Sequence, residues 1–347
     1  MIEDRDYCMS SFLTYRTVID QTKCFSLKYP PRYTKIPENR VQVHNSDELY
    51  KTLKNQVEEL CKNHKVALAL SGGIDSAVLA KFMPKGSTAY TFQCIVPGKE
   101  VTNEVPAAQK YAKECGLNHK VVKIYWEDME KYAPLLMKQK GAPIHSIEVQ
   151  IYKAAMQAKA DGFDTLLFGE SADSLYGGLS MLLSRDWTMG EFIDRFSNVL
   201  PHHALMNPQW ELEPFKQYTK DGYVDVHGFL SHIFFPESIG SYINAGTAAG
   251  VECYMPYAMT EMAVDLDLER VRKGENKYLI REVFESLYPG FVVPPKTPMP
   301  RPVNEWFENW EGPKRKEFIP HCQKAMTGNQ KWLIWSLETF LNILDEE

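Results

Sequence analysis

Apolar and polar residues alternate along the first half of the chain in blocks that predict strands and helices in turn. Residues 66–70 (VALAL) are continuously apolar, as expected of a strand buried on both faces of a parallel sheet. Asn45 to Lys65 show an amphipathic helical pattern that begins at Ser46, which we expect to cap the helix. Further strands are predicted at 89–96, 119–126 and 165–169, and further helices at 75–82, 103–115, 127–140 and 147–160.

This alternation predicts an α/β fold, a doubly wound parallel sheet with helices on both faces. We assign it to residues 46–180 and expect a ligand at the carboxyl ends of the strands. Residues 181–347 show helix-like segments without clear strand alternation, and they are interrupted by a proline-rich stretch at 292–306. The second half is therefore predicted to be a mostly helical region that completes the active site. Residues 1–45 are predicted to form an arm or short strands laid over the main body.

Composition narrows the class of protein. The net charge of −6 disfavours a protein that relies on non-specific nucleic-acid binding. The seven cysteines include no CxxC pair, which is typical of free thiols in a reducing compartment. No apolar run is long enough to span a bilayer, and the amino-terminal residues include no apolar leader segment. We therefore expect a cytoplasmic protein that acts on small molecules, without a nucleic-acid or membrane partner.

The segment SGGIDS, residues 71–76, follows the first predicted strand directly and opens the next helix. Glycines allow a sharp turn, and successive backbone N–H groups at a helix amino terminus form an anion-binding site. Asp75 would repel phosphates unless a cation intervenes, so it implies Mg²⁺. The plainer alternative is an ordinary strand-to-helix turn with Asp75 as the helix cap. The spacing is neither that of a Walker A loop nor that of a dinucleotide-binding fingerprint.

This segment resembles the pyrophosphate-binding loop of the N-type ATP pyrophosphatases, a superfamily that includes asparagine synthetase, GMP synthetase, NAD synthetase and argininosuccinate synthetase. The resemblance implies an adenine nucleotide alpha hydrolase-like fold and cleavage of ATP to AMP and pyrophosphate. A second segment, GESADSLYGG (169–178), resembles the asparagine synthetase signature GEGADELFGG, with Glu170, Asp173, Gly177 and Gly178 at matching positions. The resemblance implies that Asp75 and Asp173 hold Mg²⁺ and that Glu170 orients substrate or acts as an acid or base. The alternative is a pair of solvent-exposed acids in a loop.

Two lysines extend the resemblance. NKYLIRE (276–282) is similar to the family's KYxLR segment, which implies that Lys277 approaches the α-phosphate. PPKTPMPRPVNEWF (294–307) is similar to RPKxGFxxPxxEWL, which implies that Lys296 lies near the pyrophosphate, whereas Arg301 matches no motif position. The alternative for each lysine is a solvated surface side chain. By the same resemblance, the ATP-binding residues are expected to be Leu70, Ser71, Gly72, Gly73, Asp75, Ser76, Cys94, Phe168, Gly169 and Lys296, and the catalytic residues Lys277 and Glu170.

Several positions depart from the family pattern. Ser174 replaces an acid of the signature, and Tyr254 and Met259 replace an arginine and an acid in GVECYMPYAMTEM, residues 250–262. These departures argue against aspartate as the substrate. Position 2 is Ile2, where the family's glutaminase domain has its nucleophilic cysteine, and no glutaminase-sized region precedes the pyrophosphatase segment.

The resemblance therefore implies an amide-forming ligase that adenylates a carboxylic acid. It would take free ammonia, an amine of the substrate, or ammonia from a separate glutaminase subunit. Sulfur transfer or nucleobase modification on the same sheet remains an alternative, as does a synthetase subunit that works with a glutaminase chain. The sequence also leaves open whether the protein forms a homo-oligomer.

Overall fold

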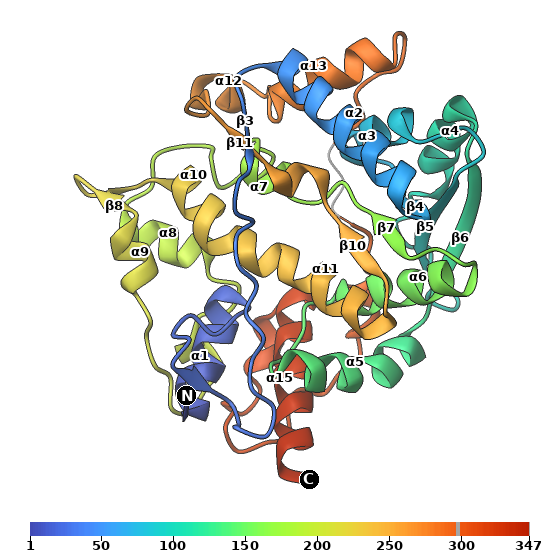
Figure 1. Ribbon diagram of the computed structural model, residues 1–347. Helices are drawn as coiled ribbons and strands as arrows, with labels where there is room; N and C mark the ends of the chain where they lie inside the picture. The colour runs from blue at the N-terminus through green and yellow to red at the C-terminus, as the bar shows by residue number, and fades with distance from the viewer. Residues whose placement is uncertain (296–298, 347) are drawn as a thin grey trace.

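The structure, a computed structural model, describes residues 1–295 and 299–346. Within these residues the largest sheet has five strands, all parallel, in the order β10-β7-β4-β5-β6 (Figure 1). The strands are β4 (Val66–Ala69), β5 (Thr88–Cys94), β6 (Asn118–Ile124), β7 (Thr165–Leu167) and β10 (Glu252–Tyr254). The predicted doubly wound α/β class is confirmed.

The strand order creates a switch point beside β4. The chain proceeds from β4 outward through β5 to β6, and then returns to the opposite side of β4 for β7 and β10. At such a switch point the loops that follow the two adjacent strands diverge and leave a crevice at the carboxyl edge of the sheet. The SGGIDS loop follows β4 and the GESADS loop follows β7, so both motifs border this crevice.

Helices cover both faces of the sheet (Figure 1). One face carries α3 (Ile74–Phe82) and α4 (Val105–Cys115), with α2 (Ser46–Asn63) and α13 (Tyr278–Leu287) packed against α3. The other face carries α6 (Glu148–Ala160), against which α5 (Trp126–Lys140) and α11 (Phe235–Ala249) pack. All four residues of β4 are buried, as the continuously apolar sequence predicts.

The second half of the chain contributes a strand that the sequence analysis did not anticipate. Glu252–Tyr254 forms β10, which pairs in parallel with Thr165–Leu167 of β7 and completes the sheet. Three residues of mixed polarity at a sheet edge give too short a pattern for sequence periodicity to detect. The expectation of a half without strands was therefore wrong at this point.

Several element boundaries also differ from the prediction by one to a few residues, as α2 and β6 illustrate. Asn45, rather than Ser46, caps α2, because its side chain accepts the backbone N–H of Glu48 at 2.9 Å. The strand predicted at 119–126 ends at Ile124 as β6, and Trp126 is already the first residue of α5.

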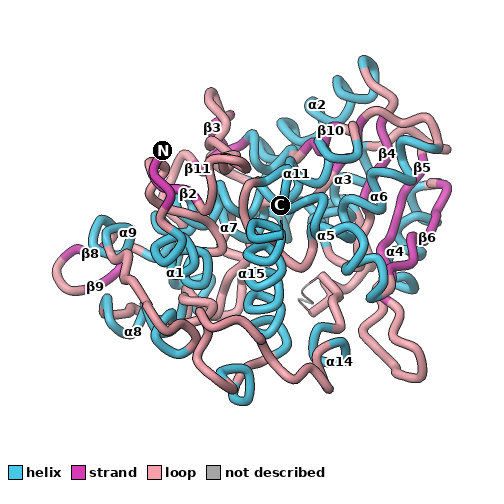
Figure 2. Tube along the Cα trace, turned by 90° about the horizontal axis from the view of Figure 1, so that it is seen from below, coloured by secondary structure: helices cyan, strands magenta, loops and turns pink. Residues whose placement is uncertain are grey.

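The first 45 residues contain a buried helix as well as short strands. In α1 (Arg5–Tyr15), residues 7–15 are all buried. This helix packs against α15 (Gly328–Glu346), and Arg5 forms an ion pair with Asp345 at 2.7 Å. Figure 2 shows both helices away from the strands of the sheet. The helix was missed because an almost completely buried helix lacks the amphipathic period that identifies a surface helix.

Short strands join distant segments elsewhere. β1 (Ile2–Glu3) pairs with β2 (Lys23–Cys24), and β3 (Val41–Val43) pairs with β11 (Thr260–Met262), both in parallel. The remaining elements are α7 (Ala172–Leu175), α8 (Met189–Phe196), α9 (Glu213–Gln217), β8 (Thr219–Lys220), β9 (Tyr223–Val224), α10 (Val226–Phe229), a π-helical turn (Leu230–Phe234), α12 (Leu268–Arg272), α14 (Val303–Trp306) and 3₁₀ turns at Pro201–His203, Pro256–Met259 and Cys322–Ala325. Among the described residues, no helix is both long and apolar enough to cross a membrane.

Candidate active site

The loop between β4 and α3 is held by its own serines. The backbone N–H of Ser71 donates to Oγ of Ser76 at 3.0 Å, and the two hydroxyl oxygens lie 2.9 Å apart. Oγ of Ser71 also accepts the N–H of Gly73 at 3.2 Å. Gly73 is the N-cap residue directly before α3, and no side chain caps the helix there. The uncapped amino terminus of α3 therefore borders a loop whose shape is fixed by hydroxyl groups, an arrangement suited to an anion.

The loop after β7 lies directly against the first loop. A Cβ atom on Gly169 would come within 2.8 Å of the backbone nitrogen of Ser76 and 3.0 Å of the carbonyl carbon of Asp75. Since both atoms belong to the backbone, only glycine permits this approach. Gly169 therefore sets the distance between the two motif loops.

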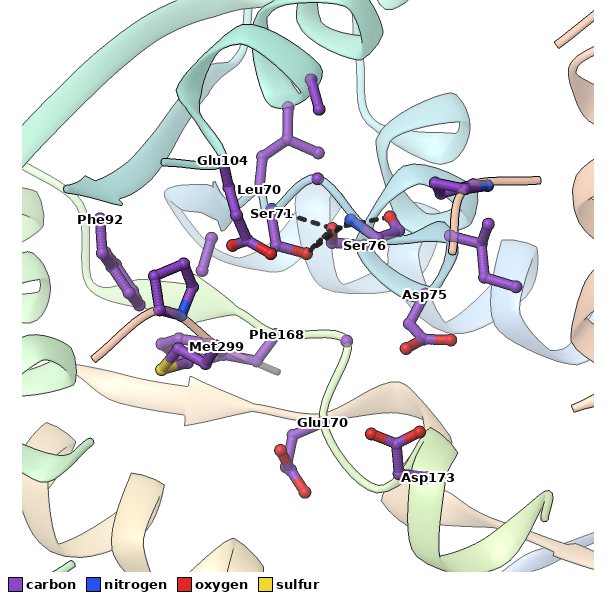
Figure 3. Close-up of a pocket in the computed structure, with 18 of the residues that line it drawn as sticks. Leu70, Ser71, Asp75, Ser76, Phe92, Glu104, Phe168, Glu170, Asp173 and Met299 are labelled. Carbon is purple, nitrogen blue, oxygen red and sulfur yellow. Dashed lines mark hydrogen bonds between the residues drawn. The ribbon is translucent and has the colours of Figure 1, made fainter. Parts of the chain in front are cut away.

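Two carboxylates and one ammonium meet where the loops converge. Nζ of Lys277 lies 2.7 Å from Oδ2 of Asp75 and 3.1 Å from Oδ1 of Asp173. Asp75 is in the first turn of α3, Asp173 is in α7, and Lys277 directly precedes α13. Figure 3 shows the Asp75 and Asp173 side chains facing each other across the cleft. The three residues that the sequence predicted to share one site are thus brought together.

Lys277 is held as a cation. Its side chain is 8% exposed, and burial alone would lower its pKa. The neighbouring carboxylates of Asp75 and Asp173 outweigh burial and raise the pKa of Lys277 above its ordinary value. Its backbone is in the left-handed region, with φ at +55°. A non-glycine residue adopts this conformation only where the surroundings hold it.

Glu170 points away from this ion cluster in Figure 3. Its carboxylate accepts a hydrogen bond from Oγ of Ser238 at 2.6 Å. Burial, followed by the charge of Glu170 and a hydrogen bond with it, raises the pKa of Tyr242 well above its usual value. Glu170 is therefore held by two hydroxyl groups of α11.

These groups line a cleft of about 340 Å³ with an apolar end. Phe92, Phe168 and Met299 lie together there, beside the end of the SGGIDS loop that is remote from Asp75 (Figure 3). Aromatic and apolar faces are suited to a flat heterocycle, whereas the loop is suited to phosphates.

Glu104, which the sequence analysis missed, also lines the cleft. It precedes α4, and its carboxylate accepts the backbone N–H of Gly72. Burial raises the pKa of Glu104 to about 7, and the bond from Gly72 lowers it only in part. A carboxyl group at the phosphate loop was not signalled by any motif, because it lies more than twenty-five residues beyond that loop, after the next strand.

Tyr257 was missed for a related reason. It lies in the GVECYMPYAMTEM segment, and its hydroxyl group donates to the backbone carbonyl of Asp75 at 3.1 Å. In the sequence this segment stood out only for its departures from the family pattern. Through Tyr257 it also fixes the backbone of the first loop.

The structure does not bring every predicted residue to the cleft. The cleft wall includes Leu70, Ser71, Gly72, Gly73, Asp75, Ser76, Phe168, Gly169, Glu170, Asp173 and Lys277. Cys94 is not on this wall. It is fully buried, its thiol contacts the carbonyl of Pro300 at 3.4 Å, and burial raises its pKa to about 12. Lys296 lies outside the described residues.

None of the three departures from the family pattern, Ser174, Tyr254 and Met259, is on the cleft wall. Ser174 is buried, and its hydroxyl group donates to the carbonyl of Ser171 at 3.1 Å. Tyr254 ends β10, and its carbonyl accepts the N–H of Phe168 at 2.9 Å. Met259 ends a 3₁₀ turn outside the cleft wall.

The cleft offers a divalent metal a small number of carboxylate donors. The described residues contain no group of three or more His, Cys, Asp or Glu side chains placed to bind a metal. The cleft does contain two carboxylates that already share one cation, the ammonium of Lys277. Magnesium commonly binds through one or two carboxylates together with substrate phosphates and water. The donors present are thus sufficient for a metal that arrives with a nucleotide.

Comparison with known proteins identifies a matching family. The asparagine synthase family profile matches residues 48–233, more than half of the chain. A protein provisionally named asparagine synthetase (glutamine-hydrolyzing) 1, from Methanocaldococcus jannaschii, is 28% identical over 134 residues. The match covers 38% of this chain and 24% of the length of that relative.

Two solved structures are similar over parts of the chain. NH₃-dependent NAD synthetase from Campylobacter jejuni is 17% identical, over 39% of this chain and 61% of the other, with a TM-score of 0.27. NMN synthetase from Francisella tularensis is 13% identical, over 74% of this chain and all of the other, with a TM-score of 0.29.

Proposed function

This chain belongs to the asparagine synthase family, and from that premise we propose that it is an ATP-dependent ligase that converts a carboxylic acid into an amide. The observation that carries the proposal is the convergence of Asp75, Asp173 and Lys277 beside an anion-binding loop at the switch point of the sheet. Family membership supports an ATP-using enzyme. The amide-forming reaction and its substrates are our proposal.

We propose that ATP occupies the cleft along its length. The loop from Ser71 to Ser76 would bind the triphosphate with backbone N–H groups and the amino terminus of α3. Phe92, Phe168 and Met299 would contact the adenine base. We retain the sequence-based prediction that Lys296 binds near the pyrophosphate. Cys94 would act indirectly at the adenine end, because its thiol contacts Pro300, which lines the cleft.

Asp75 and Asp173 would hold Mg²⁺ bound with the nucleotide. When bound, such an ion would neutralise part of the negative charge of the phosphates. The two carboxylates otherwise pair with Lys277, so in the free protein the ammonium offsets one of their two negative charges.

In the proposed reaction, an oxygen of the substrate carboxylate attacks the α-phosphorus of ATP, and the bond to the departing pyrophosphate breaks. An amine then attacks the carbonyl carbon of the acyl-adenylate, loses a proton, and AMP leaves. Lys277 would stabilise negative charge on the α-phosphate oxygens and on the carbonyl oxygen. Glu170, fixed by Ser238 and Tyr242, would position the substrate or accept the amine proton.

The amine donor stays open among free ammonia, an amine of the substrate and ammonia from a separate glutaminase subunit. The alternative of sulfur transfer receives no support from the cleft. All seven cysteines lie within the described residues, and none of them is on the cleft wall. An adenylating enzyme that transfers sulfur would usually need a reactive thiol there.

The proposal is tested by ATP–pyrophosphate exchange across a library of carboxylic acids. We expect exchange that depends on both an acid and Mg²⁺. Asp75→Asn should lower it at least a hundredfold, because the variant loses a charge that pairs with Lys277 and would hold the metal. Asp47→Asn, on the exposed side of α2, is the matched control and should retain full exchange. Exchange that survives in Asp75→Asn would contradict the assigned site.

A further inference from the structure

A second cavity, of about 740 Å³, is larger than the ATP cleft. It adjoins the cleft at Pro300 and Arg301. Its wall is built from the end of α1, the turn before α6, the segment after α7, the end of α8 and the start of α15. Most of these segments lie outside the family motifs. The ligase reaction proposed above involves none of the residues that line this cavity.

The inner part of the cavity wall carries basic side chains. Arg16, His145 and Arg301 line it, and the carboxylate of Asp194 lies with Arg195 at the exposed rim. No other carboxylate is among the described residues of the wall. The interior therefore presents hydrogen-bond donors to whatever occupies it.

Arg301 is the group whose charge is least balanced. Its Nε donates to Oδ1 of Asn329 at 3.0 Å, and no carboxylate among the described residues pairs with its guanidinium group. Burial, reinforced by the nearby charge of Arg16, lowers the pKa of Arg301 to about 10. Arg301 is partly buried. A partly buried guanidinium without a carboxylate partner is unfavourable, so an anionic ligand would stabilise it.

Arg16 and His145 are already oriented toward the same space. Arg16 pairs with Glu237 at 2.7 Å, and its buried Nε has no hydrogen-bond partner in the described part of the chain. Nδ1 of His145 accepts the N–H of Ile147 at 3.3 Å, which leaves Nε2 to carry the proton of the neutral ring. Oγ of Ser197, on the same wall, likewise has no partner among the described residues.

The cavity and the ATP cleft are lined by consecutive residues at two places in the chain. Pro300 lines the cleft, and the next residue, Arg301, lines the cavity. On α11, Glu237 binds Arg16 of the cavity, whereas Ser238 binds Glu170 of the cleft. A ligand in the cavity would thus lie close to residues that line the ATP cleft.

The remainder of the cavity is apolar and roomy. Leu179, Leu182, Phe234 and Trp332 contribute to its wall. Cavities of about 300–1,000 Å³ accommodate ligands of drug-like size, considerably larger than a single small amino acid.

We propose that this cavity binds the acid substrate, and that the substrate is a carboxylic acid with a second anionic group separated from the first by an apolar segment. The second anion would bind Arg301, with Arg16 and His145 as further donors, while the reacting carboxylate extends past Pro300 and Glu170 into the ATP cleft. This inference rests on the proposed function, because it assigns the substrate class of the same ligase.

The test uses α,ω-dicarboxylates of four to ten carbons, each compared with the monocarboxylate of equal length, for instance suberate with octanoate. Binding to the full chain is measured by calorimetry, and activation of ATP–pyrophosphate exchange is measured separately. Arg301→Gln removes the charge and Arg301→Lys retains it. Arg185→Gln is the matched control, because Arg185 pairs with Glu191 at the exposed surface. Melting temperature and ATP binding establish that each variant is folded.

We expect wild type to bind a diacid of preferred length at least tenfold more tightly than its monoacid. Arg301→Gln should weaken diacid binding about tenfold to a hundredfold and leave monoacid binding unchanged, as loss of a charge-assisted bond predicts. Arg301→Lys should keep part of the preference, and Arg185→Gln all of it.

Three results would overturn the inference: no binding of any diacid, equal binding of diacids and monoacids, or a preference that survives in Arg301→Gln. Failure of the ligase proposal looks different. Diacids would then bind in an Arg301-dependent manner, yet no acid would activate exchange. That outcome would leave an anionic ligand site without the proposed reaction.

Discussion

At the scale of single residues, the cleft is organised by one ammonium that pairs with two carboxylates. Lys277 brings an ammonium to the amino terminus of α13, where the helix dipole is also positive. Asp75 and Asp173 neutralise it in the free protein. A triphosphate would enter with negative charge of its own, so the carboxylates would then need a cation other than Lys277. This exchange of partners is the physical reason that a metal is expected to accompany the nucleotide.

Glu104 adds a titratable group at the opposite side of the phosphate loop. Burial raises its pKa to about 7, so the folded protein binds a proton there that an unfolded chain would release at lower pH. The contribution of this group to stability is full below the ordinary glutamate pKa. It is lost as the pH rises through about 7. Above that pH the carboxylate is charged and faces the loop proposed to hold phosphate.

This placement predicts a pH-dependent affinity for ATP. In wild type, the KM for ATP should rise as the pH increases from 6 to 8, because the Glu104 carboxylate then repels the triphosphate. Glu104→Gln keeps the shape of the side chain and removes its charge. Its KM should stay flat across the range and fall below the wild-type value at pH 8 by about threefold to tenfold, as for one partly screened charge. Steady-state exchange kinetics at several pH values provide the measurement.

Glu100→Gln is the control, because Glu100 is an exposed acid of the same connection. It should reproduce the wild-type pH profile. A Glu104→Gln variant that keeps the wild-type slope would show that another group controls the titration.

At the scale of elements, the site depends on two loops that end neighbouring strands. Gly169 allows them to touch, since any Cβ atom there would meet the backbone of Asp75 and Ser76. The pairing of β4 with β7 brings the two loops to the same edge of the sheet. The contact at Gly169 then keeps them in place against each other.

Gly169→Ala should separate the two loops. We expect the free energy of unfolding to fall by about 1–3 kcal/mol, because an added methyl group in a packed site forces backbone shifts. The KM for ATP should rise more than tenfold, since the anion-binding loop is displaced. Denaturant titration and exchange kinetics measure the two effects.

Gly190→Ala is a suitable comparison, because nothing lies within 4 Å of the added Cβ atom in α8. It should be neutral or slightly stabilising, as alanine is favoured over glycine in helices. Equal behaviour of the two variants would contradict the role given to Gly169.

The elements also show what sequence alone could establish. Strands β4 to β7 and both motif loops were predicted, because long apolar runs and fixed motif spacing are local signals. Helix α1 was missed because it is buried on all sides, and β10 because it is three residues long. Glu104, Tyr257 and Arg301 reach their sites through tertiary packing, which no local pattern records.

At the scale of the whole molecule, both cavities draw residues from distant parts of the chain. The ATP cleft combines loops near Ser71 and Glu170 with Lys277 and Met299, and the second cavity combines Arg16 with segments near the carboxyl terminus. The division into segments 1–45, 46–180 and 181–347 remains a prediction. Contacts across the proposed boundaries are nevertheless extensive, because β10 completes the sheet and α13 packs against α2 and α3.

These contacts predict that residues 46–180 do not fold alone. Without β10, the strand β7 becomes an edge whose Thr165, Leu166 and Leu167, all buried in the full chain, are exposed. Without α11 and α13, apolar surface of α6 and α3 is exposed as well. The isolated segment should therefore aggregate or show no cooperative thermal transition by circular dichroism, whereas the full chain should unfold in a single transition. Co-expression with residues 181–347 should restore solubility if the missing surface is the cause. A soluble 46–180 fragment with its own cooperative transition would instead establish an independent domain, and the helical region would then be an addition to a sheet that is stable without it.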